Sequence, residues 1–335
     1  MNPFVASQLN ILVEDLRLLE AYITAPLGLY SDLRMLREAL PLEEASELAQ
    51  SEKQQRRLGY RGLSERPAEI ALAIADQVEL ILKIFERLSG DNAGTIKPEW
   101  ISQARRVLGR VSHKLGRDLR TETASLVKGL YVIVDPENTG GRPVVEIAEE
   151  ALKGGSSLLQ LRDKTSQRGI VLQLAQQLRS LCEGYGALFV MNDDPALALS
   201  SKAHGLHIGQ QDIPVSEARR VIQADQIIGS SNNSIDEVVA SQTLGLDYIA
   251  IGAVFPTSTM GKGDRRVVGT GLITKAKQTT DQPVVAIGGI DKDNAPDVVL
   301  AGADCVCVVG AITLDKNPRD AAARIKEAIQ NAKKP

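Results

Sequence analysis

The sequence predicts an α/β protein, a (β/α)₈ TIM barrel preceded by an all-α N-terminal domain. Its 335 residues exceed the size of one average domain, so one large or two moderate domains are expected. In the first 128 residues, apolar side chains recur at the three- and four-residue spacing of amphipathic helices. After residue 128, short runs rich in Val, Ile and Leu alternate with longer amphipathic segments, as in parallel βα units, and 21 of the 28 glycines lie there.

The expected boundary divides the chain into a helical domain over residues 1–125 and a barrel over residues 126–335. In the helical domain, the spacing of Leu, Ile, Val and Ala predicts helices over 9–23 and 67–88. The pentapeptides LRLLE and LKIFE echo each other 66 residues apart, which hints at a duplicated helical unit.

Eight strands are expected in the barrel. They cover residues 129–135, 157–163, 187–193, 205–209, 227–231, 248–255, 283–290 and 305–312. Helices are expected between them, including 144–153, 169–183, 235–244 and 318–331. Eight strands with intervening helices in 207 residues fit a compact barrel. A doubly wound open sheet is the alternative, but the glycine fingerprint that follows its first strand is missing here.

Composition excludes several classes of protein. The chain has 39 Lys and Arg against 42 Asp and Glu and only 3% aromatic residues, so no nucleic-acid partner is expected. Glu14, Asp15 and Arg17 interrupt the apolar residues near the N-terminus, so neither a signal peptide nor a membrane span is expected. The three cysteines lack zinc-finger spacing and suit reduced thiols in a cytoplasm.

The second strand carries the first set of candidate site residues. Chemistry in such barrels collects at the carboxyl ends of the strands. Gln160, Arg162 and Lys164 alternate along this strand and point to one face, while Leu159 and Leu161 point to the other. Two cations and an amide are therefore expected at the mouth of the barrel.

Carboxylates follow the next two strands. Asn192, Asp193 and Asp194 end the third strand, and Asp194 before Pro195 is expected to cap a helix. Asp212 follows the fourth strand, so Asp193 and Asp212 together form a candidate Mg²⁺ site. Magnesium commonly binds through one or two carboxylates plus phosphate oxygens, so the neighbouring cations indicate a diphosphate at the same place.

A second anion site is expected across the mouth. Gly288 and Gly289 end the seventh strand, and Gly310 lies in the eighth, where barrels commonly bind phosphate through backbone N–H groups. The loop over 256–263, PTSTMGKG, has the composition of a mobile lid. Two phosphorylated substrates are implied. The sequence shows no Ser-His-Asp set or Cys/His cluster, which favours catalysis by leaving-group stabilisation.

Seven motifs from this region resemble thiamine phosphate synthase, and the match covers essentially all of residues 129–335. They are QLRDK (160–164), NDD (192–194), HIGQQD (207–212), IGSS (228–231), FPTST (255–259), AIGGI (286–290) and GADCVCVVGAI (302–312). The resemblance implies a transferase that joins 4-amino-2-methyl-5-(diphosphooxymethyl)pyrimidine to thiazole (carboxy)ethyl phosphate. The products would be thiamine phosphate and diphosphate, formed by Mg²⁺-dependent dissociative substitution at the pyrimidine methylene.

The resemblance also implies roles for individual residues. Asp193 and Asp212 would bind Mg²⁺, and Arg162, Lys164 and Ser231 would be catalytic. The substrates would be bound by Gln160, Leu161, Arg162, Asp163, Lys164, Asn192, Ser231, Thr257, Ser258, Thr259, Met260, Gly289, Val309 and Gly310.

The chain departs from the family pattern at three positions. Met260 replaces the lysine that usually follows the threonines, Asn233 replaces a common histidine, and Gly310 replaces a frequent serine. The missing lysine removes one cation from the diphosphate site, and Lys262 is the expected replacement.

Two rival functions are kept open for the barrel. A thiazole tautomerase-like barrel binds a similar phosphate but needs a general base, which Asn233 cannot provide. A non-catalytic ligand-binding barrel is the second rival, because Met260 departs from the family pattern.

The first helical stretch resembles an extension found on some bacterial thiamine phosphate synthases. The matching residues are Asn10, Glu14, Leu16, Arg17, Leu19 and Glu20. Relatives of that extension are small phosphomethylpyrimidine kinases, so a bifunctional chain is one expectation. The other is a packing or dimerisation domain, because any amphipathic helix would use such residues. The sequence leaves a homo-oligomer and the accepted thiazole tautomer open.

Overall fold

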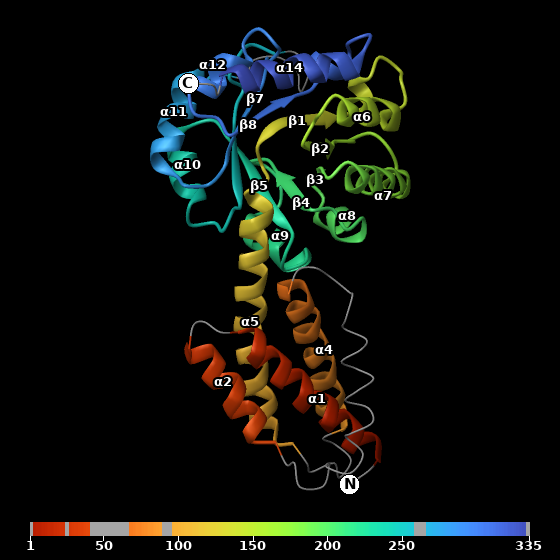
Figure 1. Ribbon diagram of the computed structural model, residues 1–335, viewed down its shortest axis with the longest axis vertical. Helices are drawn as coiled ribbons and strands as arrows, with labels where there is room; N and C mark the ends of the chain where they lie inside the picture. The colour runs from red at the N-terminus through yellow and green to blue at the C-terminus, as the bar shows by residue number, and fades with distance from the viewer. Residues whose placement is uncertain (1–2, 24–26, 41–66, 89–95, 258–265, 333–335) are drawn as a thin grey trace. The chain divides into compact units, whose positions relative to one another are not determined.

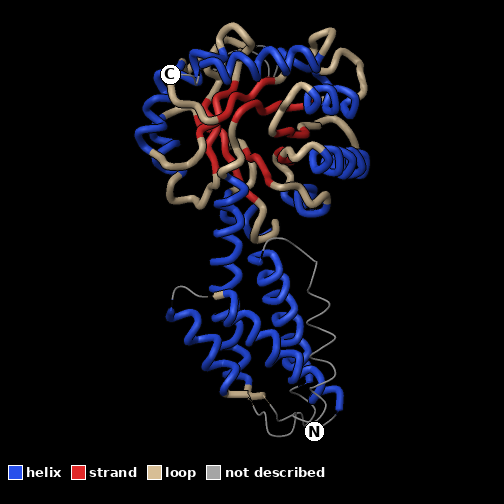
Figure 2. Tube along the Cα trace, in the orientation of Figure 1, coloured by secondary structure: helices blue, strands red, loops and turns tan. Residues whose placement is uncertain are grey.

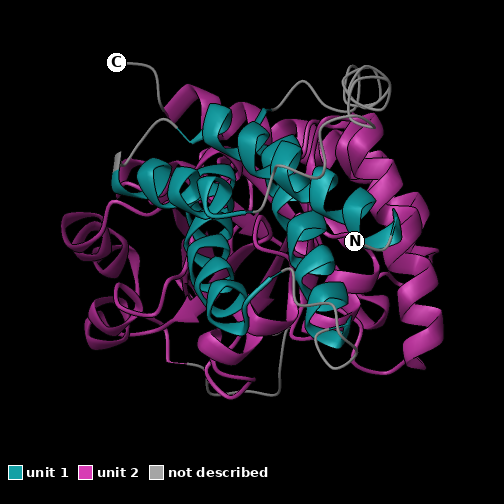
Figure 3. Cartoon of the chain, turned by 90° about the horizontal axis from the view of Figure 1, so that it is seen from below, with its two compact units in different colours: residues 1–119 teal, residues 120–335 magenta. Residues whose placement is uncertain are grey.

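The computed structural model describes residues 3–23, 27–40, 67–88, 96–257 and 266–332 (Figure 1). The chain divides into two compact units, Met1–Leu119 and Arg120–Pro335, which Figure 3 colours separately. In the described residues the first unit is helical, and every strand belongs to the second (Figure 2). The α/β class and the helical N-terminal region are as the sequence predicts.

The first unit contains α1 (Pro3–Tyr22), α2 (Leu27–Glu38), α4 (Pro67–Leu88) and the greater part of α5 (Pro98–Ala124). Helix α4 has the predicted bounds, whereas α1 begins six residues before the predicted residue 9. Helix α1 packs against both α2 and α4 through fully buried leucines that recur every three or four residues. These leucines are Leu9, Leu12, Leu16 and Leu19.

Buried polar side chains join the helices of this unit. The Nε of Arg37 on α2 donates to Glu20 Oε1 on α1 at 2.6 Å. The Nε2 of Gln77 on α4 donates to Asp15 Oδ2 on α1 at 2.9 Å. Such buried pairs select one arrangement of the helices, because a buried carboxylate needs its partner.

The second unit is a closed barrel of eight parallel strands in sequential order, which confirms the predicted fold. The strands are β1 (Gly129–Val134), β2 (Leu158–Leu161), β3 (Leu188–Asn192), β4 (Gly205–Ile208), β5 (Ile227–Asn232), β6 (Tyr248–Ile251), β7 (Val284–Ile287) and β8 (Cys305–Val308). Each lies within or next to a predicted strand. Most end earlier than predicted, because the last residues of those runs form the loops of the mouth.

Helices surround the barrel (Figure 2). They are η1 (Pro136–Asn138), α6 (Val144–Lys153), α7 (Arg168–Gly184), α8 (Pro195–Ser200), α9 (Val215–Val221), α10 (Ile235–Ser241), α11 (Thr270–Thr279), α12 (Ala295–Leu300), α13 (Gly310–Thr313) and α14 (Pro318–Ala332). All four helices named from the sequence are present, and α6 has the predicted bounds. Asp194 caps α8 as predicted, since its side chain accepts from the N–H groups of Ala196 and Leu197.

Side chains alternate between two apolar layers along each strand. Outward side chains such as Val132 and Leu159 pack against the helices. Inward side chains such as Tyr131 and Tyr248 fill the barrel. Ala124, from the last turn of α5, belongs to this inner layer. The alternation also decides which side chains reach the mouth.

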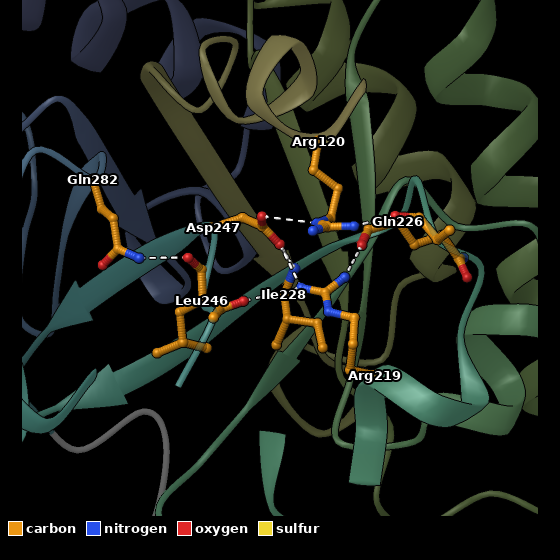
Figure 4. A network of polar contacts seen from close by, with 9 residues as sticks. Arg120, Arg219, Gln226, Ile228, Leu246, Asp247 and Gln282 are labelled. Carbon is orange, nitrogen blue, oxygen red and sulfur yellow. Dashed lines mark hydrogen bonds and ion pairs between the residues drawn. The ribbon is translucent and has the colours of Figure 1, made fainter. Parts of the chain in front are cut away.

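A polar network lies at the amino ends of β5 and β6 (Figure 4). Asp247 accepts from Arg120 Nε at 3.1 Å, from an Arg219 terminal nitrogen at 2.6 Å and from the Ile228 N–H at 2.8 Å. Arg120 lies in the last turn of α5, so the network ties this turn to the barrel. Only 10% and 12% of the Arg120 and Asp247 side chains are exposed, so each needs its partner.

The described helices include none that is both long and apolar enough to span a membrane. The three cysteines, Cys182, Cys305 and Cys307, are buried and free.

Candidate active site

A cavity of about 780 Å³ lies at the carboxyl ends of the strands. Parallel strands present all their carboxyl ends at one rim, so residues far apart in the sequence meet there. Eleven of the predicted site residues line the cavity, namely Gln160, Arg162, Lys164, Asn192, Asp193, Asp212, Ser231, Thr257, Gly289, Val309 and Gly310.

Two predicted residues of the QLRDK motif do not line the cavity. Leu161 is fully buried between the barrel and its helices, on the opposite face from Gln160. The Asp163 carboxylate accepts from the Thr165 and Ser166 N–H groups at 3.0 and 2.9 Å, which forms a local turn. These hydrogen bonds hold the Asp163 pKa below its usual value despite the opposing effect of burial.

The Arg162 guanidinium is held by Asp135, which directly follows β1. A terminal nitrogen of Arg162 donates to Asp135 Oδ2, and Asp135 is 1% exposed. The other oxygen of Asp135 accepts from the Glu137 N–H at 2.9 Å, so the carboxylate is itself fixed. Asp135 was missed at the sequence level, although an acidic residue directly after a barrel strand is a usable signal.

Lys164 and the two carboxylates form a second charged group. Lys164 Nζ lies 2.8 Å from Asp193 Oδ2, and the Asp212 carboxyl group lies within hydrogen-bonding reach of Asp193. Burial raises the Asp193 pKa, and Asp212 raises it further, while Lys164 lowers it. Asp193 also has a φ of +61°, a left-handed conformation that is unusual for a residue with a side chain.

The donor set of this group fits a magnesium ion. Asp212 Oδ2 accepts from the Gly209 N–H at 2.7 Å, which aims this carboxylate toward Asp193. Two adjacent carboxylates repel each other unless a cation or a proton lies between them. No cluster of three or more His, Cys, Asp or Glu with metal-binding geometry occurs in the described part of the chain. If the metal binds here, Asp193 and Asp212 would hold it together with substrate phosphate oxygens, as in other magnesium sites of few protein ligands.

The ends of β7 and β8 form the opposite wall of the cavity. Gly288 and Gly289 have φ values of +103° and +66°. A Cβ on Gly289 would lie 2.4 Å from the Pro256 carbonyl oxygen, so only glycine lets this loop approach the loop after β6. Gly310 begins the short helix α13, Val309 is its N-cap residue, and both line the cavity. The Asn294 side chain donates to the Gly289 carbonyl at 2.9 Å and holds this turn.

His207 is a cavity residue without a predicted role. Its Nδ1 lies 3.0 Å from Tyr248 Oη, and its Nε2 lies 3.0 Å from Ser231 Oγ. Burial lowers the His207 pKa to about 4, so the imidazole is neutral at pH 7. A signal was present in the sequence, because His207 occupies an inward position of a strand where apolar residues are usual.

Part of the predicted site lies outside the described residues. Ser258, Thr259, Met260 and Lys262 fall in the range 258–265, which the structure does not describe. Arg266, directly after this range, lines a second cavity of about 560 Å³ together with Lys164, Asp212, Ser231 and Asn233. These shared residues make the second cavity an extension of the first, and Arg266 is a cation that the sequence reasoning missed.

Fold and site together define a class of protein: a (β/α)₈-barrel enzyme of small-molecule substrates, with its cavity at the carboxyl ends of the strands. A family model described as thiamine monophosphate synthase matches residues 130–312. The chain belongs to the thiamine monophosphate synthase family, and the barrel is a transferase of this kind.

The names of similar proteins support this family assignment. The thiamine-phosphate synthase of Thioalkalivibrio sulfidiphilus is 43% identical over 206 residues, which are 61% of this chain and 97% of the relative. That of a Nostoc species is 36% identical over 236 residues, which are 70% of this chain and 63% of the relative. The solved thiamine phosphate pyrophosphorylase of Pyrococcus furiosus is 32% identical with a TM-score of 0.58, and covers 63% of this chain and 100% of that chain.

Proposed function

We propose that the barrel joins 4-amino-2-methyl-5-(diphosphooxymethyl)pyrimidine to thiazole (carboxy)ethyl phosphate in a Mg²⁺-dependent reaction. The products are thiamine phosphate and diphosphate, together with CO₂ when the thiazole substrate carries the carboxyl group. One observation carries the proposal: a single cavity has cations and paired carboxylates on one wall and glycine-rich strand ends on the other. These two walls suit a metal-bound diphosphate and a monophosphate, respectively.

The diphosphate belongs to the wall of Arg162, Lys164, Asp193 and Asp212. The two carboxylates would hold Mg²⁺, which supplies positive charge next to the leaving group. Arg162 and Lys164 bind diphosphate oxygens, and Asn192 lies in the same wall. Both cations are paired with carboxylates in the structure, so neither faces the cavity as an uncompensated charge before substrate binds.

The bond changes require no general base in the cavity. The bond between the pyrimidine methylene carbon and the diphosphate oxygen breaks, and its electron pair stays with the diphosphate. The thiazole nitrogen then donates its lone pair to the methylene carbon and forms the new C–N bond. Arg162 and Lys164 stabilise the charge that develops on the leaving oxygen, while Gln160 and Ser231 hold the pyrimidine ring.

The thiazole phosphate belongs to the opposite wall. Backbone N–H groups of Gly289, Val309 and Gly310 would supply the donors for its phosphate, and Thr257 lines the same cavity. Ser258, Thr259 and Met260 follow Thr257 in the chain, and we keep the proposal that they contribute to this site.

Arg266 is a second candidate for the cation that the family lysine provides elsewhere, beside Lys262. It lines the cavity extension with Lys164, on the diphosphate side of the mouth. Arg266→Gln and Lys262→Gln, compared in steady-state kinetics, identify the one that serves. Removing the side chain that binds the diphosphate is expected to raise the KM for the pyrimidine diphosphate about tenfold. Unchanged kinetics in both variants would reject both candidates.

The first experiment is formation of thiamine phosphate by the full chain from pyrimidine diphosphate, thiazole phosphate and Mg²⁺. We expect a product that EDTA abolishes and excess Mg²⁺ restores. Binding of both substrates without product would instead assign the non-catalytic ligand-binding barrel. Isomerisation of the thiazole phosphate without condensation would assign the tautomerase-like barrel.

We also propose the division into domains 1–125 and 126–335. For the helical domain, the two candidate roles are phosphomethylpyrimidine kinase-like activity and a packing or dimerisation function. The Nostoc match supports a shared extension, because its 236 aligned residues exceed the 216 of the barrel unit. The full chain, given pyrimidine monophosphate, ATP and thiazole phosphate, makes thiamine phosphate only if the kinase activity exists. Free thiols in a biosynthetic enzyme support the proposed cytoplasmic location.

A further inference from the structure

A row of hydrogen-bonding side chains crosses the barrel interior. It begins at Gln160, whose Nε2 donates to Tyr131 Oη at 2.7 Å. Tyr131 Oη lies 3.4 Å from Tyr248 Oη, the longest step in the row. Tyr248 Oη lies 3.0 Å from His207 Nδ1, and His207 Nε2 lies 3.0 Å from Ser231 Oγ. The row therefore joins two proposed pyrimidine-binding residues, Gln160 on β2 and Ser231 on β5.

The middle of the row is deeply buried and does not touch the cavity. Tyr131 and Tyr248 are 1% and 0% exposed, and neither lines the cavity. The Tyr248 ring lies directly against Gly229 of β5, where a Cβ would come within 2.0 Å of a ring carbon. Glycine at this position of the IGSS motif thus makes room for a tyrosine across the barrel. A bulky polar residue held so closely needs its hydroxyl satisfied, and the row satisfies it.

One consistent set of hydrogen-bond directions along the row starts from the Gln160 amide. In the orientation that the structure gives the Gln160 amide, its N–H donates to Tyr131, so the Tyr131 proton is available to Tyr248. Tyr248 then donates to His207 Nδ1. A neutral imidazole that accepts at Nδ1 carries its proton on Nε2 and donates to Ser231 Oγ. The Gln160 carbonyl oxygen is then left as an acceptor, beside the second Gln160 N–H, and the Ser231 hydroxyl is left as a donor.

We infer that Tyr131, Tyr248 and His207 are positioning residues that orient the Gln160 amide and make the Ser231 hydroxyl a donor toward the substrate. This inference rests on the proposed function, because it concerns the same pyrimidine. An aminopyrimidine offers an amino N–H to the Gln160 oxygen and a ring nitrogen to the Ser231 hydroxyl. The row thereby selects a ring with this donor and acceptor pair, and a mismatched group would leave a buried polar atom unpaired.

Tyr248→Phe tests the inference, because it removes the hydroxyl and keeps the ring against Gly229. We expect the KM for the pyrimidine diphosphate to rise about tenfold, with the KM for thiazole phosphate within about twofold of the parent. If the Tyr248 hydroxyl had only a structural role, Tyr248→Phe would lower the melting temperature and would change the KM values for the two substrates alike. Tyr185→Phe is the matched control, since Tyr185 is 45% exposed on the surface, and it leaves both constants unchanged.

A double-mutant cycle separates positioning from a general loss of order. In the parent chain, Ser231→Ala raises the KM for the pyrimidine about tenfold, whereas in the Tyr248→Phe background it does so less than about threefold. Equal effects in both backgrounds would overturn the inference. His207→Gln, which keeps an amide donor for Ser231, retains more affinity than His207→Leu if the row acts through its donors.

Direct binding distinguishes this inference from the proposed function. The affinity for pyrimidine diphosphate is measured by calorimetry with Mg²⁺ and without the thiazole substrate. A parent chain that makes no thiamine phosphate but binds the pyrimidine would refute the proposed reaction, and the Kd values of the same variants would still decide the inference. A parent chain that does not bind the pyrimidine overturns both.

Discussion

Single residues of the site are held by partners that lie far away in the sequence. Asp135 binds Arg162, and Asp193 binds Lys164, so the cations are oriented before a diphosphate arrives. Orientation in advance lowers the entropic cost of binding a flexible phosphate group. The exception is Asp193 beside Asp212, where like charges meet and only a cation or a proton relieves the repulsion.

Removing one of these carboxylates tests the metal site. Asp193→Asn is expected to lower kcat about 100-fold or more at millimolar Mg²⁺, because one of the two proposed metal ligands is lost. Steady-state assays over a series of Mg²⁺ concentrations measure the effect, and higher Mg²⁺ restores part of the rate. Asp281→Asn changes an exposed carboxylate at the amino end of β7 and keeps the parent rate. If the activity of Asp193→Asn stayed within about threefold of the parent, Asp193 would have no part in metal binding.

His207 makes the stability of the barrel sensitive to acid. Its pKa is about 4 in the folded chain, below the usual value of about 6.5 in an unfolded one. Between these two pH values, His207 binds a proton in the unfolded chain but not in the folded chain. The stability therefore falls as the pH falls from 6.5 to 4. The difference between these two pKa values limits the loss to about 3 kcal/mol.

Denaturant unfolding of the parent chain and His207→Gln, at pH 7.5 and at pH 4.5, measures this contribution. We expect the parent chain to lose more stability between these two pH values than the variant does. The same loss in both chains would show that His207 does not cause the acid sensitivity.

At the scale of elements, the loops after β6 and β7 approach each other because Gly289 has no side chain. A Cβ there would lie 2.4 Å from the Pro256 carbonyl and 2.9 Å from the Phe255 Cβ. These loops form one wall of the cavity, so their separation sets the shape of the proposed phosphate site. Some other glycines with positive φ have nothing within 4 Å of their Cβ position, so their role is confined to the turn itself; they are Gly140, Gly141, Gly186, Gly245 and Gly269.

Gly289→Ala is therefore expected to raise the KM for thiazole phosphate about tenfold or more and to lower the unfolding free energy by about 2 kcal/mol. Gly186→Ala is the matched control, because Gly186 has a φ of +64° and nothing within 4 Å of its Cβ position. This control loses about 1 kcal/mol of stability and keeps its KM. Equal KM values in the two variants would show that the close approach has no part in binding.

At the scale of the whole molecule, α5 runs across the boundary between the two compact units, and its last turn belongs to the barrel unit. Arg120 and Arg219 share the carboxylate of Asp247, and Ala124 enters the inner layer of the barrel. The barrel thus includes residues that precede its first strand. Its stability depends on them, because a buried carboxylate between two arginines is costly to leave half-paired.

Asp247→Asn tests how much the network of Asp247 with Arg120 and Arg219 stabilises the barrel. We expect the unfolding free energy to fall by about 3 kcal/mol, because two largely buried guanidinium groups lose their counter-charge. Denaturant unfolding measures the loss. Glu217→Gln, which breaks an exposed pair with Arg220, costs less than about 1 kcal/mol. The kcat is expected to stay within about twofold, since the network lies at the amino ends of the strands. If Asp247→Asn lowered the unfolding free energy as little as Glu217→Gln does, the network around Asp247 would add no stability.

Local patterns in the sequence determined the secondary structure, the order of the eight strands and the face on which Gln160, Arg162 and Lys164 lie. This was possible because the spacing of apolar residues records which side of a helix or strand is buried. The same alternation placed Leu161 on the outer face, although the family motif included it among the substrate-binding residues. The structure leaves Leu161 and Asp163 out of the cavity wall for this reason.

Only the tertiary structure decided which of these residues meet. Closure of the barrel brings Asp135 to Arg162, Asp193 to Asp212, and Tyr131 to Tyr248, which are 117 positions apart. The polarity of Ser231 depends on a tyrosine across the barrel, and Arg266 meets Lys164 in the cavity extension. Periodicity reports burial along one element, whereas contacts across a barrel depend on strand register and closure. Each of those is a property of all eight strands together.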